Sequence, residues 1–173
     1  AYSKFLFDNR YGTGQSTVDA LTHITNKLVA GKVCVVAGYG WCGKGIARRL
    51  AGLGANVIVV ETGGTLGDHE SGFHRGLEAL YDGFRVMSMD EAASVGDIFV
   101  TATGNTSILT ERHFGKMKSG AILANAGHFN VEIDIPALEQ LSTGRRTVRD
   151  FVEEFRMVDG RNIGHPDTGD VFR

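Results

Sequence analysis

Cysteine and proline are both scarce in this sequence of 173 residues, which contains two of each. Two cysteines are too few for the disulfide framework of a small secreted domain, and we therefore expect a reducing, cytoplasmic setting. Long hydrophobic runs are missing as well, whereas a membrane helix needs about 20 apolar residues in succession. The formal net charge of −2 provides no electrostatic footprint for a nucleic acid or an anionic membrane, so we expect neither as a partner.

Glycine, in contrast, is abundant, with 24 residues, about twice the usual share of roughly 7%. The glycines follow no Gly-X-Y period, which excludes a collagen-like chain. In a folded domain, glycine serves where the backbone turns tightly or approaches a ligand. Hydrophobic residues make up 42% of the chain and charged residues 22%, so the sequence can bury a core of its own.

Short apolar runs alternate with helical patterns along the chain. Strands are expected at residues 33–37, 57–60, 84–87, 97–101 and 121–124. Helices are expected at residues 16–28, 46–53, 77–81, 110–117 and 136–141, with a brief additional helix capped by Asp90. Strands and helices in alternation are typical of a doubly wound parallel sheet, so we predict an α/β fold of the Rossmann type.

We predict a single domain that spans residues 1–173. Residues 1–31 form an N-terminal segment and a helix, 32–150 form the Rossmann core, and 151–173 form a hairpin at Asp159-Gly160 and a tail. Residues 62–76 contain five glycines and no apolar period, so we expect an exposed loop inserted in the core. We expect Ser16 to cap the first helix, Gly31 to end it, and His165 to be a tail residue without a function.

A G-x-G-x-x-G pattern, followed by Lys44 and Gly45, comes directly after the first strand. Gly38 would permit a tight turn, Gly40 would let the backbone approach a pyrophosphate, and Gly43 would let the next helix pack closely. The helix N-terminus would add amide donors and the positive end of a dipole. The alternative is that these glycines serve only turns.

Glu61 ends the second strand, 23 positions after Gly38. This spacing is close to the roughly 20 residues expected for an acid that binds the ribose of a dinucleotide. A carboxylate there accepts hydrogen bonds from the ribose hydroxyls and repels a 2′-phosphate. The sequence therefore predicts NAD in preference to NADP.

Five segments carry the most distinctive motifs of the chain. They are KFLFDNRYGTGQST at Lys4–Thr17, AGKVCVVAGYGWCGKG at Ala30–Gly45, DGFRVMSMDEAASVGDIFVTATGN at Asp82–Asn105, HFGKMKSGAILANAGHFNVEID at His113–Asp134, and VDGR at Val158–Arg161. Together they resemble the NAD-binding domain of the S-adenosylhomocysteine hydrolase (adenosylhomocysteinase) family. Members of that family are far longer and carry a substrate domain. We therefore expect this chain, which starts at Ala1 without a methionine, to lack that domain and to be incomplete for catalysis.

The resemblance implies hydrolysis of S-adenosylhomocysteine to adenosine and homocysteine with the help of tightly held NAD. In that chemistry the ribose 3′-hydroxyl is oxidised to a ketone, the C4′ proton becomes acidic, and homocysteine leaves. Water then adds and the stored hydride returns, so the cofactor is recycled. A small-molecule substrate is the partner that this chemistry implies.

The resemblance also implies roles for individual residues. Lys4 and Asp8 match positions that contact the ribose hydroxyls, and Lys4 would accept the 3′-hydroxyl proton if burial lowers its pKa. His128 matches a histidine at the junction of nicotinamide and substrate, where it suits proton transfer. The cofactor contacts predicted from the glycine pattern and its acid, from strand ends and from the resemblance are Asn9, Gly38, Gly40, Trp41, Cys42, Gly43, Lys44, Gly45, Glu61, Thr103, Asn105, Asn125, Ala126 and Gly127.

Two other functions fit the same sequence: a stand-alone NAD-dependent oxidoreductase acting on a nucleoside or small alcohol, and a non-catalytic NAD-binding module. Net release of NADH would identify the oxidoreductase, and replacement of Lys4 and His128 without loss would identify the module. None of the histidines has metal-ligand spacing, so no metal is predicted. A sheet domain without its substrate domain would show an apolar face, so we expect a homo-oligomer.

Overall fold

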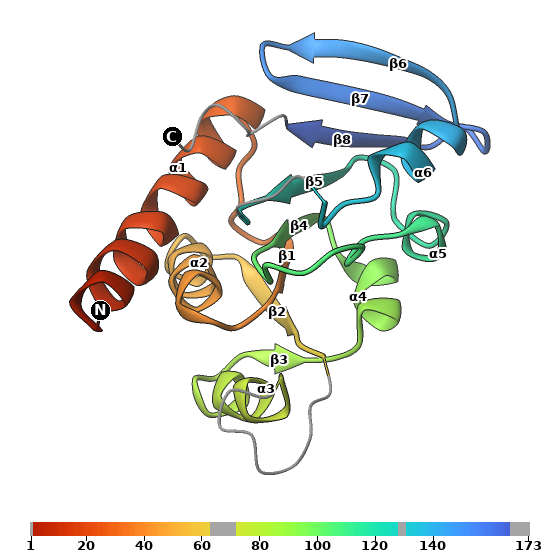
Figure 1. Cartoon of the computed structure of the whole chain (residues 1–173). Helices are drawn as coiled ribbons and strands as arrows, with labels where there is room; N and C mark the ends of the chain where they lie inside the picture. Colours follow the sequence, from red (N-terminus) through yellow and green to blue (C-terminus); the bar gives the residue numbers. More distant parts are fainter. Residues whose placement is uncertain (1, 63–71, 128–130, 167–173) are drawn as a thin grey trace.

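The computed structural model describes residues 2–62, 72–127 and 131–166. Its strands form one eight-stranded sheet with the order β3-β2-β1-β4-β5-β8-β7-β6 (Figure 1). The strands are β1 (Val33–Ala37), β2 (Asn56–Val60), β3 (Arg85–Val86), β4 (Ile98–Thr101), β5 (Ala121–Asn125), β6 (Ser142–Arg149), β7 (Val152–Met157) and β8 (Asn162–Pro166). The first five strands lie where the sequence predicts them, within two residues at each end.

The sheet is doubly wound around β1. This strand pairs in parallel with β2 on one side and with β4 on the other, and β3 and β5 extend the sheet outward. The strand order therefore reverses between β1 and β4, which creates a crevice at the carboxyl ends of these strands. The predicted α/β class is confirmed, with one addition: β8 joins β5 in parallel, and β7 and β6 continue the sheet in antiparallel fashion.

Helices cover both faces of the sheet. α1 and α2 lie on one face and α4, α5 and α6 on the other (Figure 1). The helices are the π-helical η1 (Lys4–Thr13), α1 (Gly14–Thr25), α2 (Trp41–Gly52), α3 (Gly72–Tyr81), α4 (Met89–Val95), α5 (Glu111–Phe114) and α6 (Ile135–Gln140). Since both faces are covered, the central parallel strands are buried on both sides, as their continuous apolar runs predict.

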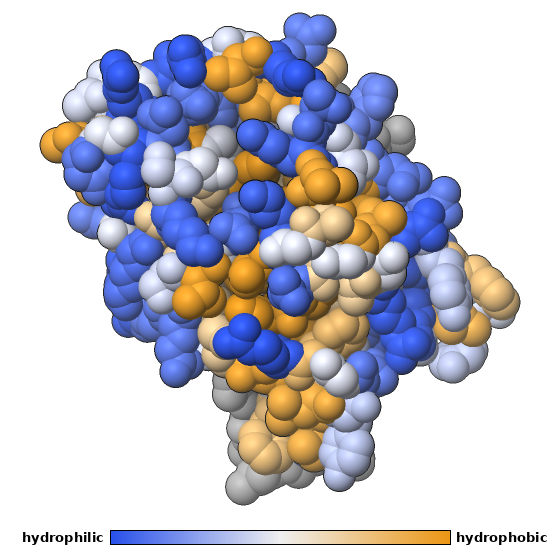
Figure 2. Space-filling model, turned by 180° about the vertical axis from the view of Figure 1, so that it is seen from behind, coloured by the Kyte–Doolittle hydropathy of each residue, from blue (hydrophilic) through white to orange (hydrophobic). Residues whose placement is uncertain are grey.

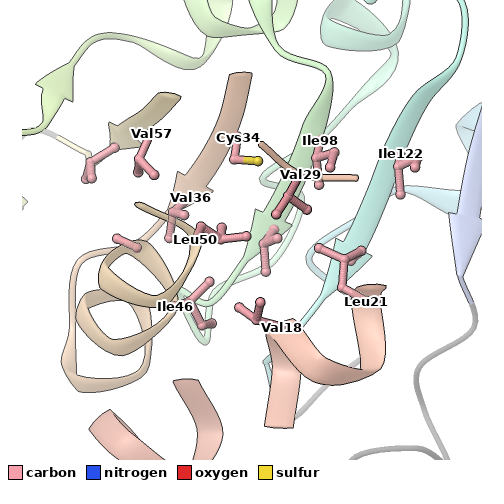
Figure 3. Packing of buried hydrophobic residues seen from close by; sticks show 14 of the residues in the cluster. Val18, Leu21, Val29, Cys34, Val36, Ile46, Leu50, Val57, Ile98 and Ile122 are labelled. Atoms are coloured by element: carbon pink, nitrogen blue, oxygen red, sulfur yellow. The ribbon is translucent and has the colours of Figure 1, made fainter. Parts of the chain in front are cut away.

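The core has two halves, one on each face of the sheet. Cys34 and Val36 point toward the α1 and α2 side, where they join a cluster that includes Leu21 and Leu50 (Figure 3). Val35 belongs to the cluster on the opposite face, because side chains alternate along a strand. Burial, and then the nearby Asp97 carboxylate, raise the pKa of the Cys34 thiol to about 12, so this cysteine is a neutral core residue.

The N-terminal segment differs from its prediction. Residues 4–13 form η1, which continues without a break into α1, so Ser16 lies inside a helix and is not a cap. A π-helix bonds residue i to i+5, so its side chains lack the 3.6-residue period by which an α-helix is recognised. The helix ends at Thr25, earlier than predicted, because Asn26 adopts a left-handed conformation with φ 51°.

The predicted loop at residues 62–76 is also partly wrong. Residues 72–76 belong to α3, and His74 therefore lies on a helix. Gly72 lets the start of α3 lie against the backbone of Thr62, because a Cβ at this position would lie 1.7 Å from the Thr62 carbonyl oxygen. Residues 63–71, including His69, lie outside the described residues.

Two helix starts were predicted with different success. Ser88, rather than the predicted Asp90, caps α4, and its hydroxyl and Glu91 form a reciprocal capping box. Asp90 instead lies in the first turn and pairs with Lys116 at 2.7 Å. α5 starts at Glu111 with Thr110 as its N-cap, one residue after the predicted start, and it ends at Phe114 rather than near Met117.

The C-terminal strands form a meander on the edge of the sheet. The predicted hairpin at Asp159-Gly160 is confirmed, since β7 and β8 pair in antiparallel fashion on either side of it. β6 is a strand that the sequence does not predict, because nearly all of its residues are exposed and no apolar alternation marks it. His165 lies in β8 opposite Glu153, which corrects its assignment to a tail.

Arg161 of the VDGR segment attaches this hairpin to the rest of the domain. Its guanidinium donates to the carbonyl oxygen of Phe114 at 3.1 Å and to that of Met117. These carbonyls lie at and just beyond the end of α5, where backbone oxygens lack intrahelical donors. Asp159 holds the same guanidinium at 2.5 Å, so the turn and the helix end are fixed together.

We predict that His113 makes the stability of the fold dependent on pH. Burial, and then the positive charges of Arg112 and Lys116, lower the pKa of His113 below its ordinary value of 6.5. The unfolded chain then binds more protons than the folded chain, so the free energy of unfolding falls as the pH drops below about 6.5, by at most about 1.4 kcal/mol per pH unit. Urea unfolding between about pH 8 and pH 5 measures this slope.

The variant His113→Asn is the control, because it removes the titrating ring and keeps an acceptor near the Thr110 N–H, which lies 3.1 Å from His113 Nδ1. Its slope below about pH 6.5 should be shallower than that of the unmodified chain. Equal slopes for the two proteins would contradict the prediction.

Candidate functional site

The three glycines of the G-x-G-x-x-G pattern occupy three different environments between β1 and α2. Gly38 has φ +95°, and a Cβ there would lie 2.7 Å from the carbonyl oxygen of Ala102. A Cβ on Gly43 would lie 1.8 Å from the carbonyl oxygen of Gly38, so α2 can start this close to β1 only without a side chain. A Cβ on Gly40 would meet nothing within 4 Å. The loop is therefore tight at both ends and open at its middle glycine.

The open glycine lies at the start of α2. Gly40 is the N-cap of this 12-residue helix, and no side chain caps it. The first N–H groups of a helix lack intrahelical acceptors, and the helix dipole places partial positive charge there. Accessible backbone and free amide donors together suit an anionic group such as a pyrophosphate.

Glu61 follows β2 at the same edge of the sheet. Its Oε1 accepts a hydrogen bond from the backbone N–H of Tyr39, inside the glycine loop. The ring of Tyr39 is fully buried, and its hydroxyl donates to Asp82 at 2.7 Å. Burial, and then Asp82, raise the pKa of Tyr39, which keeps the phenol a neutral donor. Tyr39 thereby ties the loop to the residue that follows α3.

The outer side of the glycine loop packs against helices. The Lys44 ammonium pairs with Glu78 of α3 at 2.7 Å and lies 5.5 Å from the centre of the Trp41 ring. The Trp41 ring in turn contacts Tyr2 edge-on and stacks with Phe5. The predicted cofactor contacts Trp41 and Lys44 are thus engaged with α3 and the N-terminal helix, and their cofactor role stays a prediction.

The structure brings the N-terminal candidates together beside this loop. The Lys4 Nζ atom lies 2.8 Å from the Asp8 carboxylate and 2.6 Å from the Asn9 Oδ1 atom. The Asn9 amide donates to the Cys42 sulfur at 3.2 Å. The Lys4 side chain is 56% exposed, so the burial on which its predicted proton-accepting role depends is not found among the described residues.

Close backbone contacts hold the N-terminal helix, which consists of η1 and α1, against α2. A Cβ on Gly45 would lie 1.8 Å from the carbonyl oxygen of Arg10, and a Cβ on Gly14 would lie 2.7 Å from the carbonyl carbon of Gly45. Gly45 therefore acts in helix packing, which the sequence pattern alone does not indicate.

Thr101 and Asn125 end the neighbouring strands β4 and β5 and lie opposite each other in register. Both are buried, and the Thr101 hydroxyl donates to the Asn125 side-chain oxygen at 3.2 Å. The same oxygen accepts the Gly127 N–H at 2.8 Å. Asn125 therefore shapes the turn through Ala126 and Gly127 that follows β5.

A buried carboxylate that the sequence does not predict lies next to this turn. Glu132 is 1% exposed and accepts three hydrogen bonds, from the backbone N–H and hydroxyl of Thr103 and from the N–H of Gly104. The Thr103 hydroxyl also accepts the N–H of Asn105 at 3.0 Å. The one available signal was an acid placed between two apolar residues, Val131 and Ile133, which is too common to single out.

His128 lies outside the described residues. Within residues 2–62, 72–127 and 131–166, no group of acids, histidines or cysteines could hold a metal ion, and no helix is long and apolar enough to cross a membrane. A cavity of about 310 Å³ lies away from the glycine loop, near the amino end of β5, and is lined in part by Asn26, Gly120 and Arg149.

Comparison with known proteins gives a match to the family described as S-adenosyl-L-homocysteine hydrolase, NAD binding domain, over residues 9–169. The chain is 57% identical to the adenosylhomocysteinase of Aeropyrum pernix over 94% of its length and 58% identical to that of Archaeoglobus fulgidus over 93%. It is 59% identical to the S-inosyl-L-homocysteine hydrolase of Methanosarcina mazei over 93% of its length. The chain covers 37%, 38% and 37% of these three relatives.

Solved structures with a similar fold are more distant in sequence. A dipicolinate synthase from Bacillus halodurans matches 79% of this chain and 44% of its own, with a TM-score of 0.65 and 19% identity. A D-lactate dehydrogenase from Treponema pallidum matches 77% of this chain and 44% of its own, with a TM-score of 0.60 and 19% identity. These likenesses support the doubly wound fold, while the family match covers nearly all of the sequence. The chain therefore belongs to the NAD-binding domains of the S-adenosyl-L-homocysteine hydrolase family, and its cofactor is NAD.

Proposed function

We propose that this chain holds NAD for an enzyme of the adenosylhomocysteinase type, with the pyrophosphate at the start of α2. The observation that carries this proposal is the open middle glycine: Gly40 has room for a ligand where Gly38 and Gly43 have none. Glu61 would bind the adenosine ribose, and the loops after β4 and β5 would hold the nicotinamide half. Bound NAD supplies a reversible hydride acceptor, and the residues of the chain bind and orient it.

The proposed overall reaction is hydrolysis of S-adenosylhomocysteine to adenosine and homocysteine. Lys4, held by Asp8 and Asn9 beside the glycine loop, would accept a proton from the substrate ribose, and His128 would assist proton transfer. The curated relatives are more than twice as long as this chain, and we propose that a substrate domain completes the site and buries Lys4. The Methanosarcina mazei relative matches as well as the others, so a substrate with hypoxanthine in place of adenine is a second candidate.

A cytoplasmic setting is proposed because both thiols, Cys34 and Cys42, are free.

Self-association is proposed because α3 leaves apolar side chains in contact with water. Phe73, Leu77 and Leu80 are 53%, 45% and 53% exposed. Figure 2 shows hydrophobic side chains gathered at the lower end of the molecule, where α3 lies.

The first test is a calorimetric titration of the chain with NAD⁺, combined with two glycine variants. In Gly40→Ala the new methyl group meets no protein atom within 4 Å, so the fold should survive while the methyl occupies the space for the pyrophosphate. We expect NAD⁺ affinity to fall at least about tenfold, with a melting temperature within about 2 °C of the unmodified chain.

Gly52→Ala is the matched control. It lies at the other end of α2 and also meets nothing within 4 Å, so NAD⁺ affinity should stay unchanged. Equal affinities for Gly40→Ala and Gly52→Ala would contradict the proposed pyrophosphate position. Absence of NAD⁺ binding by the unmodified chain would contradict the proposal as a whole.

The variant Glu61→Gln tests the ribose contact. Glutamine keeps an acceptor for the Tyr39 N–H but loses the charge, and hydrogen bonds to charged groups contribute about 1.5–3 kcal/mol. We expect roughly tenfold weaker binding of NAD⁺ and a smaller preference for NAD⁺ over NADP⁺, measured by the same titration. Tighter binding of NADP⁺ than of NAD⁺ by the unmodified chain would overturn the role of Glu61.

Self-association is tested by sedimentation equilibrium. We expect the chain to form an oligomer that dissociates when Leu77 and Leu80 are both replaced by lysine, because charges replace exposed apolar surface. Replacement of the exposed Val158, which lies near the β7–β8 turn, by lysine is the control and should leave the oligomer intact. A monomer at high concentration of the unmodified chain would refute this part of the proposal.

A further inference from the structure

We infer that Glu132 is a positioning residue that clamps together the loops following β4 and β5 and thereby shapes the nicotinamide half of the NAD site. The inference rests on the proposed NAD site. It adds to that site a residue that belongs neither to the glycine loop nor to the ribose contact at Glu61. Glu132 lies in the connection from β5 to α6, and its side chain, which is 1% exposed, reaches the turn after β4 and packs against Gly127 in the turn directly after β5.

The first loop is held by three hydrogen bonds. One carboxylate oxygen of Glu132 accepts the N–H of Thr103 at 3.0 Å and its hydroxyl at 2.9 Å, and the other accepts the N–H of Gly104 at 2.9 Å. Both backbone donors point at the carboxylate, so the turn after β4 is built around it. Since an unpaired buried carboxylate is costly, these three donors also make the burial of Glu132 possible.

Gly127, in the turn directly after β5, lies against the same carboxylate. A Cβ on Gly127 would lie 2.0 Å from Oε1 of Glu132 and 3.0 Å from the side-chain oxygen of Asn125. Asn125 in turn accepts the Gly127 N–H at 2.8 Å. The turn after β5 is thus pressed between Asn125 at the strand end and Glu132, with no room for a side chain.

Glu132 is itself fixed from behind. Its carbonyl oxygen accepts the N–H of Ile108 at 2.8 Å and the N–H of Leu109 at 3.0 Å. Leu109 also forms a parallel bridge with Ile133. The backbone at position 132 is therefore anchored to the segment between β4 and α5, and the side chain extends from that anchor to the two loops.

The topology indicates which half of the cofactor this clamp serves. Glu61 marks the end of β2 and the glycine loop marks the end of β1, so the adenosine and the pyrophosphate occupy that side of the crevice. A dinucleotide lies across the point where the strand order reverses, and its other half then lies over β4 and β5. Loss of the Glu132 clamp should weaken contacts to the nicotinamide half and spare those to the adenosine half.

The test compares two ligands on the variant Glu132→Gln. Glutamine has nearly the same shape, but its NH₂ group would face a backbone N–H donor. One of the two backbone hydrogen bonds to the loop after β4, from Thr103 or from Gly104, is therefore lost. By calorimetry we expect NAD⁺ to bind about tenfold more weakly, whereas ADP-ribose, which lacks the nicotinamide, should bind within about twofold of the unmodified chain. Glu139→Gln, an exposed residue of α6 that pairs with Arg145, is the matched control and should change neither affinity.

Hydrogen exchange of the ligand-free chain gives an independent readout. The amides of Thr103 and Gly104 should exchange faster in Glu132→Gln than in the unmodified chain, while amides of β1 stay equally protected. This measurement separates the clamp from the cofactor: if the unmodified chain binds no NAD⁺, the proposed function fails, and unchanged exchange at these two amides removes the clamp by itself.

An equal loss of NAD⁺ and ADP-ribose affinity would mean that Glu132 supports the fold and not one half of the site, and no loss of either would refute the inference. If Glu132→Gln does not unfold cooperatively, Glu132→Asp replaces it, since a shorter carboxylate keeps the charge and shortens the reach. That variant should lose NAD⁺ affinity selectively, and equal losses for both ligands would again overturn the inference.

Discussion

The contact between the start of α2 and the end of β1 controls the geometry of the whole crevice. The Cα of Gly43 lies so close to the carbonyl oxygen of Gly38 that no side chain fits between them. This contact aims the N-terminus of α2 across the carboxyl ends of the strands, where its amides and dipole can act on an anion. The open surface at Gly40 and the position of Tyr39 both follow from the same turn.

Two glutamates then complete the crevice, one on each side of the point where the strand order reverses. Glu61 accepts the backbone N–H of Tyr39 in the loop after β1, and Glu132 accepts the N–H groups of Thr103 and Gly104 in the loop after β4. In each case a side-chain carboxylate holds a neighbouring loop by its backbone. The shape of the site therefore depends on charge-assisted hydrogen bonds from main-chain N–H groups to these two carboxylates, with the Thr103 hydroxyl as a further donor to Glu132.

The parts of the fold that could be predicted from the sequence are those with local signals. The strand Val33–Ala37 is apolar on both faces, and Glu61 follows the glycines at a regular distance, so both are visible in a linear pattern. β6 is exposed on both faces, and η1 lacks the 3.6-residue period, so neither leaves such a pattern. Glu132 was missed for a different reason: its partner Thr103 is 29 residues away, and only the folded sheet brings them together.

The contact between Gly45 and the carbonyl oxygen of Arg10 has a consequence for how the site moves. Backbone meets backbone there, with no flexible side chain to absorb a displacement, so the N-terminal helix and α2 behave as one rigid body. Lys4 lies on that helix and donates a hydrogen bond to Asn9, and the Asn9 amide in turn donates to the Cys42 sulfur at the start of α2. The place of Lys4 beside the start of α2 is accordingly set by contacts within the chain itself, and any rearrangement that displaced the N-terminal helix would have to displace α2 with it.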